Sequence, residues 1–179
     1  MYSVRHRSLV AALMLVAAVS GCGSTPSAAT QEPAAKTAAE QQAPVQQLRT
    51  IPLTIVTNDG KRHGYTVEVA RTSDEQAQGL MYRRSMPKDA GMIFPFAAPR
   101  PATFWMHNTY IPLDMVFLLA DGRIESILAD VPPLNEAQRS SLGPVAAVLE
   151  LNAGEAARIG ATPGDLVEYD LRDLQGGAE

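Results

Sequence analysis

The chain has 179 residues, of which 15 are Lys or Arg and 19 are Asp or Glu, so its formal net charge at pH 7 is −4. This acidic balance disfavours nucleic acid and anionic lipid headgroups as partners, because phosphate binding depends on clustered positive charge. The single Cys excludes an intramolecular disulfide, so the stability of the fold has to come from packing.

The amino terminus has the pattern of a signal peptide. A basic start is followed by an apolar run over residues 9–19, and then by Ser20, Gly21 and Cys22. The run is too short to span a bilayer, which needs about 20 apolar residues. The small residues before the only Cys resemble the lipobox of bacterial lipoproteins. This resemblance implies that residues 1–21 are removed and that Cys22 is lipidated. An ordinary secretory signal, which would leave Cys22 as a free thiol, is the alternative.

A lipidated Cys22 predicts a location in the cell. Its diacylglycerol and amide-linked acyl chain, such as palmitate, would suffice for stable membrane anchoring. In Gram-negative lipoproteins an Asp after the Cys resembles an inner-membrane retention signal, and here the residue is Gly23. We therefore expect a lipoprotein of the cell envelope, at the outer membrane and facing the periplasm if the organism is Gram-negative. Removal of the signal leaves 13 basic and 19 acidic residues, or a net charge of −6.

The rest of the chain divides into a tether and one domain. Residues 22–48 are rich in Ser, Thr, Pro, Ala and Gln, with no large apolar side chain before Leu48 apart from Val45, so we expect a disordered tether after the lipidated Cys. Residues 49–174 are enough for a single domain with its own core. Residues 175–179 are expected to form a flexible C-terminus.

The first predicted elements of the domain are a hairpin and a short helix. Short β-branched runs at 53–56 and 65–69 flank Asn58-Asp59-Gly60, a pattern typical of a turn between antiparallel strands. Ser73 is the expected N-cap of the helix, with Gln76 three residues later, and the helix is expected to run to about Tyr82.

Further strands are predicted at 92–94, 103–108, 114–119, 123–129, 145–151 and 166–171, with a turn at Asp121-Gly122. A second short helix is expected at 153–159, closed by Gly160. Many short strands and few helices indicate an α+β, β-rich fold, with a compact, mostly antiparallel, barrel-like sheet and two short helices.

Two of the predicted strands have apolar residues on both faces. Between residues 103 and 109, alternation places even-numbered and odd-numbered side chains on opposite faces of a strand. On the next strand, Leu113, Met115 and Phe117 share one face and oppose Asp114, Val116 and Leu118. We expect both strands to be buried on both sides for part of their length.

Four ordered blocks complete a pattern that resembles a known family. They are Gly79–Arg83, Gly91–Phe94, Phe104–Met115 and Val148–Gly154. Over about 53–169 the chain is similar to the uncharacterised prokaryotic family catalogued as domain of unknown function 192. The resemblance implies a compact β-rich α+β fold and supplies no activity. Arg83, Asn108, Asp114 and Glu150 match positions within its recurring motifs.

Polar residues at strand ends define a candidate pocket. Asn108 and Asp114 flank a short connection that contains Pro112, so we expect their side chains to lie near one another at a sheet end. Both residue types also bond nearby backbone groups beside such turns, which is the structural explanation. Glu150 and Asn152 share a face at the end of another strand. The full set of candidate pocket residues is Arg83, Trp105, His107, Asn108, Asp114, Glu150 and Asn152.

Two further functions are compatible with these residues. Convergence of Asp114 and Glu150 would allow a hydrolase or a divalent-metal site, because two carboxylates serve as general acid and base or as oxygen ligands. No recognised nucleophile, zinc or phosphate-loop motif accompanies them. Arg83 paired with either acid would explain the same residues without chemistry. His107 stands where the family usually has Lys, which disfavours a mechanism that requires imidazole.

The methionines allow a copper site. The five Met residues after Cys22 fall between residues 81 and 115, and thioether sulfur is a soft ligand suited to Cu(I). The candidate ligands are Met92, Met106 and His107. Met also fills gaps in cores beside aromatic residues, and the abundant Phe of this segment favours that explanation.

Taken together, the sequence predicts a lipid-anchored envelope protein whose domain binds a small ligand or an envelope protein. No cofactor is indicated by the motifs, and catalysis is not predicted.

Overall fold

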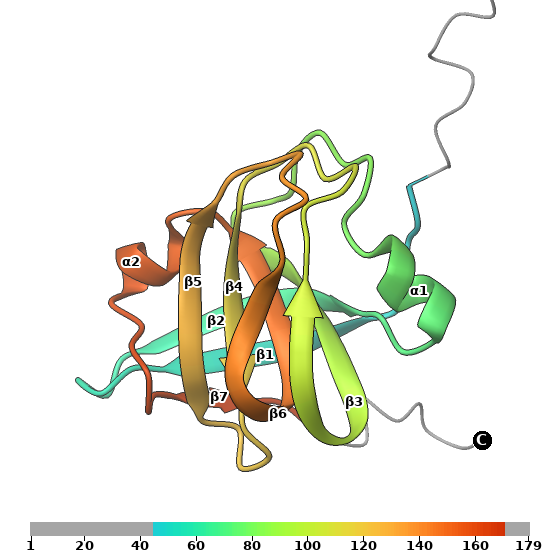
Figure 1. The fold of residues 1–179 in the computed structure, drawn as a ribbon. Helices are drawn as coiled ribbons and strands as arrows, with labels where there is room; N and C mark the ends of the chain where they lie inside the picture. Colours follow the sequence, from blue (N-terminus) through green and yellow to red (C-terminus); the bar gives the residue numbers. More distant parts are fainter. Residues whose placement is uncertain (1–44, 171–179) are drawn as a thin grey trace, which may run out of the picture. The chain divides into compact units, whose positions relative to one another are not determined.

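Seven strands form one curled sheet in the computed structural model, which describes residues 45–170 (Figure 1). They lie in the order β5-β4-β6-β3-β2-β1-β7, and among these strands only β2 and β3 pair in parallel. The strands are β1 (Thr50–Val56), β2 (Arg62–Val69), β3 (Ala90–Phe104), β4 (Leu113–Leu118), β5 (Ile124–Val131), β6 (Arg139–Asn152) and β7 (Leu166–Glu168).

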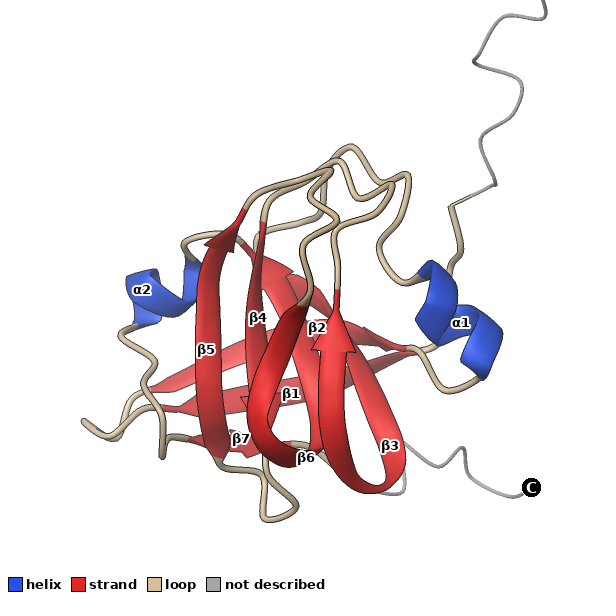
Figure 2. Cartoon of the chain, in the orientation of Figure 1, coloured by secondary structure: helices blue, strands red, loops and turns tan. Residues whose placement is uncertain are grey.

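Two short helices, α1 (Ser73–Gln78) and α2 (Glu155–Ile159), accompany the sheet on opposite sides in Figure 2. The predicted β-rich, barrel-like fold with two short helices is confirmed. Within residues 45–170 neither helix has the length and apolar character needed to cross a membrane. The predicted signal peptide, the predicted lipidation site Cys22, the predicted tether as far as residue 44 and residues 175–179 lie outside the described residues.

The predicted hairpin is confirmed as β1 and β2, paired from Thr50↔Glu68 to Val56↔Arg62. Gly60 has φ +78°, a conformation that glycine adopts without strain. The Thr57 N–H donates to the Lys61 carbonyl over 3.0 Å, which closes the turn. The turn chemistry read from the sequence therefore sets the register of this pair.

Helix α1 begins one residue earlier than predicted and is shorter. Its N-cap is Thr72, whose hydroxyl accepts from the Glu75 N–H, while the Glu75 carboxylate accepts from the Thr72 N–H. This reciprocal pair is a capping box, and it is centred on Thr72 rather than on Ser73. The helix ends at Gly79, with φ +49°, so the predicted extension to Tyr82 is wrong.

β3 is longer than predicted, and the strand predicted at 103–108 ends early. A single strand runs from Ala90 to Phe104 and includes the segment predicted at 92–94. Beyond Phe104 the Thr109 N–H donates to the Met106 carbonyl over 3.2 Å, and Asn108 has φ +51°. Residues 105–109 therefore form a turn, and the predicted alternation of their side chains across a sheet is wrong.

The remaining elements confirm the chain order that was predicted. β4 and β5 flank the turn at Gly122, β6 contains the segment 145–151, and α2 is closed by Gly160 at φ +73°. β7 stops at Glu168, three residues short of its predicted end.

The two faces of the central strands belong to two cores. The first, here called the barrel core, takes residues from all seven strands and fills the inside of the curl. The second, the outer core, covers the opposite face of β3, β4 and β6, beneath α1 and its following loop. In β4, Val116 and Leu118 lie in the barrel core, and Leu113, Met115 and Phe117 lie in the outer core, as predicted.

β7 links the two ends of the sheet. On one side Val167 pairs with Ile55 of β1, and on the other Leu166 bridges to Arg123 at the start of β5. The Val167 N–H also donates to the Gly122 carbonyl over 2.9 Å. A Cβ at Gly122 would lie 2.8 Å from the Val167 carbonyl oxygen, so glycine is required for this close approach. The curl is thereby closed at one end.

Candidate functional site

Glu150 is the central residue of the candidate site. It lies on β6, where it pairs with Met92 of β3 on one side and Met115 of β4 on the other. Its side chain is directed into the outer core and is only 4% exposed. Such a position is expected for an apolar residue, because burial of an unpaired acid is costly.

The carboxyl group of Glu150 has no hydrogen-bond partner among the described residues, and burial alone raises its pKa to about 8. The group is therefore mostly protonated at neutral pH. Its oxygens are not among the fully enclosed polar atoms that lack a partner in residues 45–170, so water or a ligand in an adjoining pocket can supply the partner that the fold does not.

A small pocket of about 40 Å³ opens beside Glu150. One wall is the end of α1 with the loop that follows it, and the other walls come from β3 and the turn after it. Phe94 and Phe104 meet edge to face, with their ring centroids 5.1 Å apart. The lining residues are Gln76, Ala77, Gln78, Gly79, Leu80, Met81, Phe94, Phe104, Trp105, Thr109 and Glu150. We call this cavity the Glu150 pocket.

Trp105 lies at the solvent-facing part of the pocket, with 51% of its surface exposed. Its indole ring stacks on the His107 imidazole at a centroid distance of 5.0 Å and an interplanar angle of 26°. The His107 Nδ1 lies 2.9 Å from the Glu136 carboxylate. His107 does not line the pocket itself, but it holds the indole on its outer side.

Three loops meet next to this pocket and are tied together by backbone hydrogen bonds. They are residues 79–89, 105–112 and 132–138, here called the loop cluster. The Tyr82 N–H donates to the Asn108 carbonyl over 2.8 Å, and the Leu134 N–H donates to the Thr109 carbonyl over 3.0 Å. Each loop contains one non-glycine residue at positive φ, namely Tyr82, Asn108 and Leu134. Strained backbone of this kind concentrates at binding sites.

Asn108 and Asp114 are not brought together. The Asn108 side-chain amide donates to the Tyr82 hydroxyl over 2.9 Å, within the loop cluster. Asp114 is fully buried, and its carboxylate accepts from the backbone N–H groups of Asp130, Gly154 and Ala156 over 2.9, 3.1 and 2.8 Å. Asp114 thus fixes the bulge of β5 and the start of α2.

The two carboxylates of the hydrolase hypothesis also lie apart. Asp114 pairs in register with Leu151, and Glu150 pairs with Met115, so the two acids point to opposite faces of the β4–β6 ladder. Residues 45–170 contain no group of three or more His, Cys, Asp or Glu side chains arranged to hold a metal ion. The geometry gives no support to joint action of Asp114 and Glu150.

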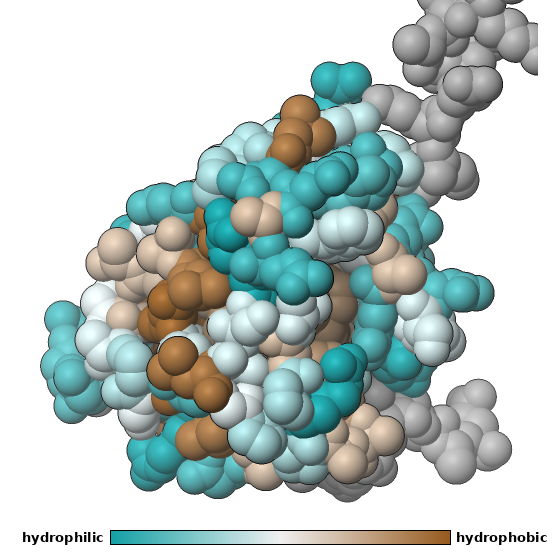
Figure 3. Space-filling view, in the orientation of Figure 1, coloured by the Kyte–Doolittle hydropathy of each residue, from teal (hydrophilic) through white to brown (hydrophobic). Residues whose placement is uncertain are grey.

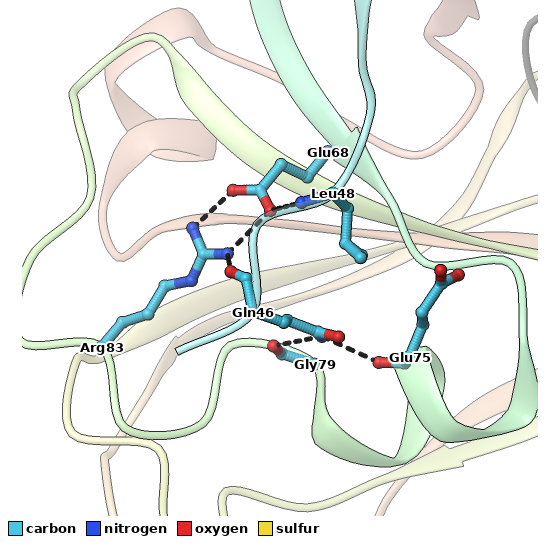
Figure 4. A network of polar contacts seen from close by, with 6 residues as sticks. All are labelled: Gln46, Leu48, Glu68, Glu75, Gly79 and Arg83. Carbon is cyan, nitrogen blue, oxygen red and sulfur yellow. Dashed lines mark hydrogen bonds and ion pairs between the residues drawn. The ribbon is translucent and has the colours of Figure 1, made fainter. Parts of the chain in front are cut away.

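Arg83 pairs with Glu68 rather than with either of these acids. Its guanidinium donates through Nη1 and Nη2 to the two Glu68 carboxylate oxygens, over 2.5 and 2.8 Å, and both side chains are largely buried. Figure 4 shows the same guanidinium donating to the Gln46 carbonyl, while Glu68 accepts from the Leu48 N–H. Arg83 and Glu68 therefore fasten the segment that precedes β1.

The Gln46 side chain completes this network. Its amide nitrogen donates to the carbonyls of Glu75 and Gly79, over 2.9 and 2.8 Å, at the end of α1 (Figure 4). The last residues of the predicted tether thus contact the domain, and they do so behind the wall of the Glu150 pocket. The Asn152 side chain, the remaining candidate, donates to the Pro87 carbonyl over 2.9 Å and fixes the loop before β3.

The methionines lie mainly in the outer core. Met92, Met106 and Met115 are fully buried there beside Phe94 and Phe117, whereas His107 is outside and paired with Glu136. This arrangement is the packing role expected from the aromatic neighbours of these residues. It does not assemble the predicted copper ligands.

A second polar cluster, which the sequence did not indicate, lies at α2. The Glu155 carboxylate accepts from the Tyr65 hydroxyl over 2.8 Å and from the Arg158 Nε over 2.7 Å. The Arg158 guanidinium holds the pKa of Glu155 below its usual range, and burial raises the pKa of Tyr65. All three groups are satisfied within the protein, so the cluster has a structural explanation.

Two larger depressions, of about 270 and 420 Å³, lie around β7 and the turn at Gly122. The Arg123 guanidinium beside them donates to the Gly164 carbonyl over 2.8 Å, and the Asp165 carboxylate accepts from the Thr162 N–H over 2.7 Å. The Glu150 pocket is smaller, but its acid has no internal partner, and we therefore regard it as the candidate site.

The face seen in Figure 3 is mostly polar, with apolar surface gathered in a few groups. The large apolar residues that are exposed within the described part of the chain are Val45, Trp105, Leu134 and Leu142. Trp105 and Leu134 belong to neighbouring loops of the loop cluster, because the Met106 N–H donates to the Asn135 carbonyl over 2.8 Å.

Comparison with known proteins gives a family and two close structures. The model of the family described as "DUF192: Uncharacterized ACR" matches residues 54–169. A crystal structure from Sinorhizobium meliloti, described as a "putative transcription regulator", is 45% identical, with a TM-score of 0.68 over 69% of this chain and 96% of that one. A protein of unknown function from Novosphingobium aromaticivorans is 48% identical, with a TM-score of 0.67 over 74% and 97% of the two chains. No curated protein matches the chain significantly.

Proposed function

We propose a ligand-binding function for this chain, which belongs to the DUF192 family. In this proposal the protein is a lipid-anchored component of the cell envelope, and its β-rich domain binds a small ligand in the Glu150 pocket without catalysis of its own. One observation carries the proposal: a carboxyl group with no internal hydrogen-bond partner lies at the base of an aromatic pocket.

The energetics of Glu150 favour a binding role over a packing role. Leu or Met at this position would fill the outer core without burying a polar group, as Met92 and Met115 do on the neighbouring strands. Burial of this carboxyl group lowers stability, but by less than the about 1–3 kcal/mol of a fully enclosed unpaired group, because its oxygens still reach the pocket. A residue that lowers stability in this way is typical of functional sites, where activity is retained at the expense of the fold.

The lining of the pocket favours binding over catalysis. Glu150 is the only titratable side chain among the described residues that line it. Acid–base catalysis usually needs a second group to accept or supply a proton, and Asp114, the buried acid on the neighbouring strand β4, faces away and is bonded to three amides.

The anchor is supported by the sequence. The apolar run at 9–19 and the small residues before Cys22 are typical of a lipoprotein signal, and an acyl-modified Cys22 would tie the domain to a membrane through residues 23–44. The regulatory description of the Sinorhizobium protein does not extend to this proposal, because a net charge of −4 gives no electrostatic support for DNA binding.

An envelope protein is the second candidate occupant. Trp105 and Leu134 are 51% and 61% exposed on neighbouring loops, and exposed aromatic and aliphatic residues anchor many protein interfaces. We favour a small ligand because the buried acid lies inside a pocket, whereas a flat protein surface would leave it unused.

Ligand binding is tested by thermal-shift screening of the detergent-solubilised full-length protein with a library of small polar metabolites. The wild type and Glu150→Gln are compared, with Glu168→Gln as a matched control on β7, outside the pocket. We expect a compound that stabilises the wild type and Glu168→Gln but leaves Glu150→Gln unchanged. If every stabilising compound acts equally on all three proteins, the Glu150 pocket is not the binding site.

The anchor is tested separately. Cells that express the full chain are labelled with a palmitate analogue, and membrane and soluble fractions are compared for the wild type and Cys22→Ala. Incorporation into the wild type alone, with release of Cys22→Ala from the membrane fraction, is the expected result. Equal membrane association of an unlabelled Cys22→Ala protein would contradict the anchor.

A further inference from the structure

The chemistry of the Glu150 pocket points to a class of ligand, an inference that depends on the binding function proposed above. We infer that the pocket accepts the primary ammonium group of a small alkylamine, with the nitrogen against the Glu150 carboxylate and the carbon chain leading out past Trp105.

The charges that line the pocket favour a cationic ligand. The lining contains one carboxyl group and, among the described residues, no Lys, Arg or His side chain. A ligand anion would have no counter-charge there. A ligand cation would pair with a carboxylate that is 4% exposed, where the low dielectric strengthens the attraction.

The polar groups of the pocket include hydrogen-bond acceptors that suit a ligand with several donors. The Thr109 hydroxyl donates its only hydrogen to the His107 carbonyl over 3.2 Å, so its oxygen retains acceptor capacity alone. A deprotonated Glu150 is also an acceptor. An ammonium group brings three donors and no acceptor, which complements such a lining.

The aromatic wall of the pocket also favours a cation. Phe94, Phe104 and Trp105 surround the approach to Glu150, and a cation within about 6 Å of an aromatic ring centroid is attracted by the ring's quadrupole. Tryptophan gives the strongest such attraction. Its position at the exposed part of the pocket leaves the inner Phe pair to contact the first methylene groups.

The size of the pocket limits the head group of the ligand. A volume of about 40 Å³ holds a group of a few heavy atoms, since one water needs at least 10–15 Å³ measured in the same way. An aminomethyl group fits this space, and a trimethylammonium group is too bulky. The volume of the pocket therefore admits primary ammonium groups and excludes quaternary ones.

Glu150 holds a proton in the empty pocket, so binding of an ammonium ion should depend on pH and release that proton. Burial raises the pKa of this carboxyl to about 8, and no other titratable side chain lines the pocket from α1, β3 or the turn after β3. Binding of an ammonium ion at pH 7 then displaces a proton. The affinity should rise by up to tenfold per pH unit between pH 6 and 8 and level off above that.

The test uses n-propylammonium with the detergent-solubilised full-length protein. Trp105 is the only Trp in the chain, so its emission reports directly on the pocket. Three matched compounds serve as controls. Propionate carries the opposite charge, n-propanol carries no charge, and tetramethylammonium is a cation with a bulkier head group. We expect a saturable change in emission with n-propylammonium, at least tenfold weaker responses to the other three, and release of about one proton per ligand by calorimetry in two buffers at pH 7.

The variants are Glu150→Gln, which keeps the shape of the side chain, and Glu150→Asp, which keeps the acid and draws it back by one methylene. Both should bind n-propylammonium at least tenfold more weakly, whereas Glu168→Gln should be unchanged. If Glu150→Gln does not fold by circular dichroism, Glu150→Asp and the proton release decide the question.

Different results would overturn the ammonium inference and the ligand-binding function. Equal binding of propionate or n-propanol, or n-propylammonium affinity that does not depend on residue 150, would overturn the ammonium inference. If a different compound from the thermal-shift screen still requires Glu150, the binding function stands without it. If no compound depends on Glu150, both are overturned.

Discussion

Asp114 and Glu150 are buried acids on neighbouring strands, one register step apart, and they differ in how their charge is accommodated. Asp114 accepts three backbone N–H groups at the junction of β5 and α2. Glu150 faces the outer core and has no hydrogen-bond partner in the described part of the chain. Burial of an acid is therefore not by itself the mark of a site. The mark is a buried acid whose partners are missing from the fold.

The largest effect that separates the two acids is on stability. Asp114→Ala leaves three buried N–H groups without an acceptor, and each unsatisfied group costs about 1–3 kcal/mol. We expect the free energy of unfolding to fall by about 4 kcal/mol in urea titrations at pH 7. Glu150→Gln should change it by less than about 1 kcal/mol. Similar losses in the two variants would remove the distinction between these acids.

The next effect is the pH dependence that Glu150 gives to the fold. Its pKa is raised to about 8 in the folded protein, from 4.5 when unfolded, so between these values the folded state holds a proton that the unfolded state has lost. The contribution of Glu150 to stability is present below pH 4.5 and is lost as the pH rises through 8. Each pH unit within this window removes up to about 1.4 kcal/mol.

This pH dependence is measured by urea titrations at pH 5, 6, 7 and 8 on the wild type and Glu150→Gln. The difference between the two proteins should change by about 3 kcal/mol over the range, with the wild type losing stability at the higher pH. A constant difference from pH 5 to 8 would show that Glu150 is already charged, and would conflict with its lack of partners.

Glu68 is intermediate between Asp114 and Glu150, because its main partner is a charged side chain of the protein, the Arg83 guanidinium. Its side chain is 15% exposed and that of Arg83 is 12% exposed. Arg83→Met leaves Glu68 with the Leu48 N–H alone, and we expect a loss of about 2 kcal/mol. In a double-mutant cycle, Glu68→Gln should then cost far less in the Arg83→Met background than in the wild type. Additive losses would mean that the two residues act independently.

The smallest effect on stability is expected at the mouth of the pocket. Trp105→Ala removes a half-exposed ring, and the free energy of unfolding should change by no more than about 0.5 kcal/mol. Phe94→Ala, in the outer core, should cost about 3 kcal/mol. Thermal or urea denaturation compares the two. A large loss for Trp105→Ala would assign the indole to the fold rather than to the site.

The sequence predicted most of the fold because its signals are local. The turn at Asn58-Asp59-Gly60, the two-sided apolar pattern of β4 and the glycine after α2 each depend on residues close in the chain. The errors arose where residues that are distant in sequence determine the local conformation. Residues 105–109 keep the alternation of a strand, but the bond from Met106 to Asn135 and the positive φ of Asn108 turn the chain away.

The candidate site was less predictable for the same reason. Trp105 and Glu150 were both selected from the sequence and line one pocket. Nothing in the sequence showed that Asp114 would meet backbone donors of β5 and α2, or that Arg83 would pair with Glu68. The sequence also did not predict that residues Gln76–Met81 line the pocket, because this depends on the position of α1 beside β3.

The pairing of β1 with β7 has a consequence for the order in which the protein folds. Thr54 near the start of the domain pairs with Glu168 near its end, so the sheet is completed only after the intervening chain has been synthesised. Contacts between residues so distant in sequence slow folding, since a long loop must close before they form. Under the proposed export to the cell envelope, this late pairing would help to keep the chain unfolded until translocation is nearly finished.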